Sequence, residues 1–184
     1  ELMQADLLDR DSLKKALEGV DILFQVAAVF KFWSSQPEEE IIKPNIEGTR
    51  NILELAKEAG VKKIIYISST SVLDKSCEVW EEESPWNSNP MNYYEQSKIG
   101  SEKLAWEIAN ELDLNLISVL PTAMIGKNCL SNLTVTMSFI YAILQNKFVL
   151  DPNFGFCYVD IQDVADGIIK LAEKGKIHER YILG

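Results

Sequence analysis

Tyr94 and Lys98 are the two residues whose types and spacing most directly suggest chemistry. They stand four apart in a stretch with a helical pattern, so on a helix both side chains point to the same side. A phenol has an unperturbed pKa near ~10, and a nearby ammonium lowers that pKa toward the range useful for general acid–base catalysis. The alternative is a surface tyrosine and a solvated lysine. The rest of the chain must decide between the two.

The composition is that of an ordinary soluble globular protein, with 47% hydrophobic and 25% charged residues in 184. By length we expect one domain over residues 1–184. A net charge of −10 argues against a nucleic-acid partner, which needs clustered Lys and Arg. No apolar run approaches the roughly 20 residues of a membrane span, so we expect no membrane partner either.

The cysteines and the histidine suggest no metal site. Cys77, Cys129 and Cys157 are odd in number, far apart, and form no C-x-x-C pair. We therefore expect neither a disulfide framework nor a metal site, and a cytoplasmic location. The only histidine, His178, lies in a polar stretch, which favours a surface role.

Short apolar runs alternate with helical patterns along the chain. The predicted strands cover residues 21–28, 62–69, 114–120 and 156–159, and the third is expected to be broken by Pro121. The predicted helices cover residues 41–59, 92–112, 134–145 and 161–173, after a short helix capped by Asp11 and Ser12. Asp160 and Asp163 favour the start of the last helix over catalysis.

This alternation predicts an α/β fold with a doubly wound, Rossmann-like parallel sheet and helices on both faces. The first three strands are almost continuously apolar, as expected of strands covered on both sides. Active sites in such sheets collect at the carboxyl ends of the strands. The ends near residues 26–28, 68–69 and 120–122 are therefore expected to converge with the Tyr94/Lys98 helix around one crevice.

The chain has the appearance of an internal piece of a longer protein. It starts at Glu1 without a methionine and stops at Gly184, directly after a strand-like run. We therefore expect the sheet to lack its first strands and most of a C-terminal substrate lobe.

Several segments match known motifs in the right order. They are Asp6-Leu7, Val26-Ala27-Ala28 (H-x-A-A), residues 45–51 (N-V-x-G-T-x-N), Ser69 followed by Tyr94-x-x-x-Lys98, residues 121–126 (R-P-x-x-V-x-G) and residues 158–165 (V-H-V-D-D-V-A). Together they resemble the extended short-chain dehydrogenase/reductase family, in its dihydroflavonol-reductase-like and sugar-epimerase-like branch. The match covers nearly the whole chain.

The resemblance implies a Ser-Tyr-Lys catalytic set. Tyr94 would relay a proton to or from the substrate oxygen, Lys98 would lower the Tyr94 pKa and hold the nicotinamide ribose, and Ser69 would hydrogen-bond the substrate oxygen. Ser68, Thr70 and Ser71 are rivals for the serine role, or all four hydroxyls merely satisfy a strand end.

The resemblance also implies a nicotinamide cofactor, NADP or NAD. The implied cofactor contacts are Asp6, Leu7, Ala27, Ala28, Asn45, Tyr94, Lys98, Pro121, Thr122 and Met124. For Asn45, helix capping and packing are alternatives to a cofactor contact.

The main departure from the family is the absence of the glycine-rich turn that binds the cofactor pyrophosphate. The nine glycines of the chain never come closer than eight positions to each other. The residue that selects NAD or NADP is also not visible. The only arginines of the sequence are Arg10, Arg50 and Arg180, so few are available to bind the diphosphate of a sugar nucleotide.

Three functions remain open. The first is an NAD(P)-dependent oxidoreductase acting on a small-molecule secondary alcohol or ketone with a hydrophobic body. The second is a sugar epimerase that keeps its cofactor bound, and the third is a non-catalytic dinucleotide-binding scaffold. Trp80 and Trp86 suit a substrate lid or loop anchors equally. Relatives often dimerise through the helices at 41–59 and 92–112, so a homodimer is possible by analogy.

Overall fold

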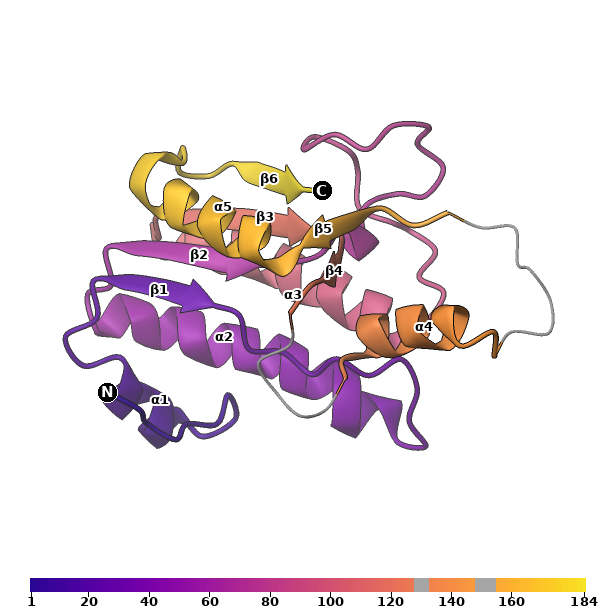
Figure 1. The fold of residues 1–184 in the computed structure, drawn as a ribbon. Coiled ribbons are helices and arrows are strands. Elements are labelled where there is room, and N and C mark those ends of the chain that lie inside the picture. Colours follow the sequence, from indigo (N-terminus) through magenta and orange to yellow (C-terminus); the bar gives the residue numbers. More distant parts are fainter. Residues whose placement is uncertain (128–132, 148–154) are drawn as a thin grey trace.

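The structure is a computed structural model that describes residues 1–127, 133–147 and 155–184. Four parallel strands form a central sheet in the order β1-β2-β3-β6, with helices on both of its faces (Figure 1). The strands are β1 (Ile22–Gln25), β2 (Lys63–Ile67), β3 (Leu116–Pro121) and β6 (Arg180–Leu183). The predicted α/β fold with a parallel, Rossmann-like sheet is confirmed.

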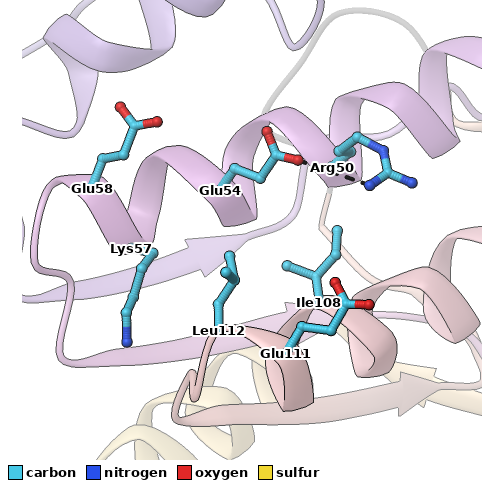
Figure 2. Close-up of a pocket in the computed structure, with 7 residues that line it drawn as sticks. All are labelled: Arg50, Glu54, Lys57, Glu58, Ile108, Glu111 and Leu112. Carbon is cyan, nitrogen blue, oxygen red and sulfur yellow. Dashed lines mark ion pairs between the residues drawn. The ribbon is translucent and has the colours of Figure 1, made fainter.

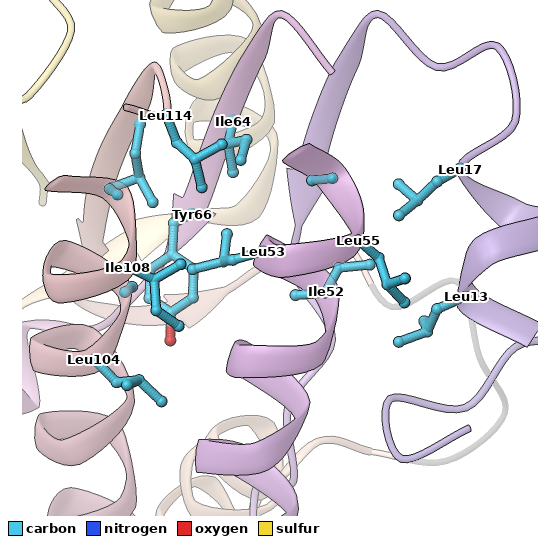
Figure 3. Packing of buried hydrophobic residues seen from close by; sticks show 14 residues of the cluster. Leu13, Leu17, Ile52, Leu53, Leu55, Ile64, Tyr66, Leu104, Ile108 and Leu114 are labelled. Carbon is cyan, nitrogen blue, oxygen red and sulfur yellow. The ribbon is translucent and has the colours of Figure 1, made fainter. Parts of the chain in front are cut away.

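Helices α2 (Lys43–Glu58) and α3 (Tyr93–Glu111) cover one face of the sheet. Side chains that alternate along β2 and β3 turn to this face, among them Ile64, Tyr66 and Leu116, and pack against both helices (Figure 3). Leu13 of the short helix α1 (Arg10–Ala16) and Leu17 directly after it join the same cluster from outside α2.

Helix α5 (Ile161–Lys174) covers the other face. The intervening side chains Ile65, Ile117 and Val119 pack there around Ala172. Burial on both sides explains why β2 and β3 appear as continuous apolar runs in the sequence.

A smaller parallel pair, β4 (Ala123–Ile125) and β5 (Tyr158–Asp160), lies beyond the end of β3. Asp160 caps α5 by accepting from the backbone N–H of Gln162 at 2.7 Å, as its position predicted. Helix α4 (Val135–Leu144) packs beside β4. Strand β4 was not predicted, because a three-residue strand gives too little periodicity.

The predicted helix at 41–59 begins earlier than expected. A π-helical turn, η1 (Glu38–Ile42), leads directly into α2. The helix ends at Glu58, and Gly60 follows with a φ of 74° that favours glycine. The helix predicted at 92–112 is confirmed as α3, with Asn92 as its N-cap.

Three local predictions are wrong. Asp9, rather than Asp11 or Ser12, caps α1, because its carboxylate accepts from the backbone N–H groups of both. Strand β1 is not covered on both faces: Ile22 and Phe24 are 40% and 39% exposed. Its segment lies at one end of the strand order, where α5 does not reach.

Pro121 does not break its strand but is the last residue of β3, paired with Leu183 of β6. The N–H groups of Ser118 and Thr122 donate to the carbonyl oxygens of Glu179 and Leu183, on the β6 side. The intervening Pro121 nitrogen therefore faces β2. The hydrogen bonds between β2 and β3 end with the one from the Ser68 N–H to the Val119 carbonyl, because Pro121 has no N–H to continue them.

Candidate active site

Tyr94 lies in the first turn of α3. Asn92 fixes the start of this helix by accepting from the backbone N–H of Glu95 at 2.9 Å. The half-buried Tyr94 ring packs edge-to-face against Phe30 and Phe32, with ring centroids 4.7 and 5.7 Å away. The helix cap and the two rings therefore fix the phenol from two sides.

Burial raises the pKa of Tyr94 to about 12, and a hydrogen bond with Ser69 acts in the opposite direction. The pKa of Tyr94 therefore lies above its ordinary value rather than below it as expected, because the burial effect dominates, and an effect of Lys98 on this pKa stays a prediction. The ammonium of Lys98 donates instead to the carbonyl oxygen of Ile67, at 2.8 Å.

Lys98 is itself only 5% exposed. Burial lowers its pKa to about 8, while the negative charge of Glu102, one turn further along α3, works to raise it. An ammonium has three N–H donors, and the hydrogen bond to the Ile67 carbonyl uses one. Lys98 is thus a buried cation with donor capacity left for a ligand.

A small pocket lies at Lys98, where the ends of β1 and β2 meet α2 and α3. It is lined by Gln25, Ala27, Ala28, Asn45, Thr49, Tyr66, Ile67, Lys98 and Ser101. Two of the three predicted strand ends therefore converge with the Tyr94/Lys98 helix. Ala27 and Ala28 are exposed and carry the smallest chiral side chains, so they leave the backbone open to a ligand.

Among the four hydroxyls at the end of β2, Ser69 is the one that affects the Tyr94 pKa, and its Oγ accepts from the backbone N–H of Ser71 at 3.2 Å. Thr70 donates to the carbonyl oxygen of Pro121 at 3.3 Å. The hydroxyls of Ser68 and Ser71 are buried with no hydrogen-bond partner among the described residues. The assignment of the serine role to Ser69 stays a prediction.

The third strand end lies further from the pocket. Pro121, Thr122 and Met124 do not line it, although the Thr70–Pro121 hydrogen bond joins the ends of β2 and β3. Met124, on β4, is 38% exposed. Their cofactor contacts stay predictions.

Asp6 and Leu7 precede α1 and also do not line the pocket. Leu7 packs so closely on Gly48 that a Cβ there would lie 2.8 Å from the Leu7 Cβ. Asn51 donates to the Leu7 carbonyl at 3.0 Å. The adenine contact predicted for Asp6 and Leu7 likewise stays a prediction.

Sequence reasoning missed Phe30 and Phe32. They follow the strand end at Ala27 and Ala28 in a Val-Phe-Lys-Phe-Trp run that the helix and strand patterns did not explain. Both rings are more than 40% exposed, although they contact the candidate catalytic residue. An aromatic run directly after a strand end was the available signal.

Trp86 is a loop anchor. Its indole N–H donates to a carboxylate oxygen of Glu102 at 3.1 Å, and the guanidinium of Arg180 lies 4.9 Å from its ring centroid. Trp80 is 36% exposed and donates to the carbonyl oxygen of Asp74 at 3.0 Å.

A larger groove of about 290 Å³ runs between α2 and α3, away from Tyr94 (Figure 2). It is lined mainly by charged side chains, including Arg50, Glu54 and Glu111. On these two helices Tyr93 is the one exposed large hydrophobic side chain among the described residues. The described part of these helices therefore exposes little apolar surface that would support the predicted homodimer.

Among the described residues no group of three or more His, Cys, Asp or Glu side chains is placed to hold a metal ion. In the same part of the chain, none of the helices combines the length and apolar character that crossing a membrane requires.

Comparison with known proteins shows the family. The chain matches the NAD dependent epimerase/dehydratase family over residues 1–184. It is 33% identical to anthocyanidin reductase from Arabidopsis thaliana, with 98% of this chain and 59% of the reductase aligned. The chain thus spans less than two thirds of this relative.

Solved structures agree with the fold. The crystal structure of gox2253 is 37% identical and superposes with a TM-score of 0.91, over 100% of this chain and 56% of that one. Yeast methylglyoxal/isovaleraldehyde reductase Gre2, solved with NADPH, is 24% identical with a TM-score of 0.79, over 97% of this chain and 61% of its own. With its pocket at the strand ends and a Tyr-x-x-x-Lys pair beside it, the chain belongs to the NAD dependent epimerase/dehydratase family.

Proposed function

We propose that the protein carrying this chain is an NAD(P)-dependent oxidoreductase that transfers a hydride to or from a secondary alcohol or ketone. The observation that carries the proposal is the placement of three side chains. Tyr94 and Lys98 stand one turn apart on α3, and Ser69, at the end of β2, is near enough to Tyr94 to lower the pKa of its phenol. The similarity to anthocyanidin reductase supports the same reaction class.

Each residue has a distinct role in the reduction direction. Tyr94 donates its phenolic proton to the substrate oxygen as negative charge develops there. Ser69 hydrogen-bonds the same oxygen and orients it. Lys98 places a positive charge beside the resulting phenolate and so favours proton loss from Tyr94.

The residues at the pocket fit a nicotinamide cofactor, which supplies the hydride when bound. Lys98 is a buried cation with donors suited to ribose hydroxyls, and the small, exposed side chains of Ala27 and Ala28 would let a ligand approach their backbone. Asp6 and Leu7 are proposed to meet the adenine. We propose that Pro121, Thr122 and Met124 meet the nicotinamide end. Whether NAD or NADP is preferred rests on residues outside these motifs.

The test is consumption of reduced cofactor by the protein that carries this chain, with apolar ketones as substrates. Tyr94→Phe is expected to lower kcat by about 100-fold or more, because the proton donor is lost. Cofactor affinity is expected to persist. Tyr93→Phe, at the neighbouring exposed tyrosine of the same helix, is the matched control and should retain activity. Full turnover by Tyr94→Phe would remove Tyr94 from the mechanism.

The same assay separates the epimerase alternative. An epimerase returns the hydride to its substrate, so added NADPH would not be consumed while a sugar nucleotide changed configuration. The scarcity of arginine favours the reductase. We propose a cytoplasmic protein, supported by the free thiols of Cys77 and Cys157.

A further inference from the structure

The side chain of Asn45, on α2, hydrogen-bonds to both backbone groups of Val29, a residue on another segment. Its Oδ1 accepts from the N–H of Val29 at 2.7 Å, and its Nδ2 donates to the carbonyl oxygen of Val29 at 3.0 Å. The side chain is 3% exposed. A primary amide thus pairs with both backbone groups of Val29, as a neighbouring strand would.

The second N–H of the same amide connects to α3. Asn45 Nδ2 donates to Ser97 Oγ at 2.9 Å, and Ser97 Oγ donates to the carbonyl oxygen of Tyr94 at 2.8 Å. Ser97 is fully buried. Both N–H groups of Asn45 are therefore used within the protein, which leaves no donor for a cofactor.

The residue that follows Val29 is Phe30. The Phe30 and Phe32 rings contact each other at 5.2 Å between centroids and both contact the Tyr94 ring. These two rings are otherwise exposed, so few other contacts fix them. Val29, held by Asn45, directly precedes Phe30, while Lys31, between the two rings, pairs with Glu40 of η1.

We propose that Asn45 is a positioning residue for Tyr94: by holding Val29 it sets Phe30 and Phe32 against the Tyr94 ring. Through Ser97, Asn45 also links Val29 to the backbone carbonyl of Tyr94. The proposal rests on the proposed function only where it treats Tyr94 as catalytic. In this proposal Asn45 acts by positioning Tyr94 rather than by contacting the cofactor.

Asparagine is the residue type that this role requires. Aspartate keeps an acceptor for the Val29 N–H but turns a carboxylate oxygen toward the Val29 carbonyl, which repels it. Alanine leaves both backbone groups of Val29 without their partner. Asn45→Asp, which is nearly the same size, therefore serves as a second variant should Asn45→Ala fold poorly.

The first test needs no activity. In a protein with ¹³C-labelled tyrosine rings, Tyr94→Phe identifies the Tyr94 signals by their loss. Asn45→Ala and Phe30→Leu are each expected to shift those signals, because the ring currents of the packed phenylalanines change. Asn115→Ala is the matched control, since it removes an asparagine bond to the Lys62 carbonyl at the opposite end of the sheet.

The second test is kinetic. Asn45→Ala is expected to lower kcat/KM about ten-fold, the cost of losing buried hydrogen bonds. In the Phe30→Leu background the same change should have an effect under about twofold, because both variants disturb one unit. The KM for the cofactor should stay unchanged in Asn45→Ala.

Unshifted Tyr94 signals in both Asn45 variants would overturn the proposal. The proposal would equally be overturned if the losses of Asn45→Ala and Phe30→Leu multiplied in the double variant. A raised KM for the cofactor would overturn it in favour of a direct cofactor contact. Absence of ketone turnover in the unmodified protein would instead refute the proposed function, while the ring signals still decide whether Asn45 positions Tyr94.

Discussion

Arg180 of β6 and Glu102 of α3 form a two-point ion pair inside the protein. Arg180 Nε lies 3.2 Å from Glu102 Oε1, and Arg180 Nη2 lies 3.0 Å from Glu102 Oε2. The Glu102 side chain is fully buried and also accepts from Ser118 and Trp86. The remaining Nη1 of Arg180 donates to two carbonyl oxygens of the loop that carries Trp86. The pair therefore joins a strand, a helix and this loop.

Arg180→Met is expected to lower the free energy of unfolding by about 3–5 kcal/mol, because it leaves the Glu102 carboxylate buried without its cation. Urea unfolding measures the loss. Adding Glu102→Gln should recover part of it, since the buried charge is then also removed. A loss that grows in the double variant would contradict this account.

Arg10→Met is the matched control. Arg10 pairs with Glu54 at 2.7 Å, but the two side chains are 42% and 34% exposed. Water already solvates both charges, so the expected loss is under about 1 kcal/mol.

The stability contribution of Lys98 is expected to depend on pH. Its pKa is lowered to about 8 in the folded protein, against 10.5 when unfolded. Between these values the unfolded state binds more protons, so stability rises with pH relative to Lys98→Met. The rise amounts to about 3 kcal/mol, at 1.36 kcal/mol per pKa unit. Unfolding of both proteins from pH 7 to 11 measures it, and a constant difference would contradict the burial of Lys98.

Tyr94 is expected to act with the opposite sign at higher pH. Its pKa is raised from 10.0 to about 12, so between these values the folded state binds more protons. Stability should therefore fall with rising pH relative to Tyr94→Phe. The same unfolding series, extended above pH 10, tests this sign.

Ser69→Ala is expected to lower kcat by about 100-fold, because a hydrogen-bond donor to the reacting oxygen is lost. Ser68→Ala is the control at the adjacent position: its hydroxyl has no hydrogen-bond partner among the described residues, so its removal should change kcat little. Steady-state rates of the two variants compare them directly. A larger loss in Ser68→Ala would transfer the serine role to that residue.

The 184-residue chain on its own is expected to bind NADPH weakly or not at all. It carries no glycine-rich turn to hold the pyrophosphate. A fluorescence titration tests this, and saturation at micromolar NADPH would contradict it.

The fold was predictable because its elements have strong local signals. The uninterrupted apolar runs of β2 and β3 reflect burial on both faces, and Asn92 and Gly60 mark helix ends by their own chemistry. Strand β1 has the same kind of run, yet half of it is exposed. An apolar run in the sequence shows only that the side chains are apolar. Whether those side chains are exposed depends on whether a helix covers the strand.

The site was predictable where residue type and spacing carried it, as for Tyr94 and Lys98. The contacts of Phe30, Arg180 and Asn45 were not predictable, because each joins segments far apart in the chain. The Arg180–Glu102 pair spans 78 positions. No local pattern encodes such a pairing.

Strand β1 has a consequence for handling the isolated chain. Among the described strands it pairs only with β2, so one row of its backbone N–H and C=O groups has no strand beside it. Ile22, Phe24 and Val26 are also 40%, 39% and 59% exposed. An open ladder flanked by apolar side chains is a template for adding a strand from another molecule. The chain alone should therefore self-associate as its concentration rises, through β1.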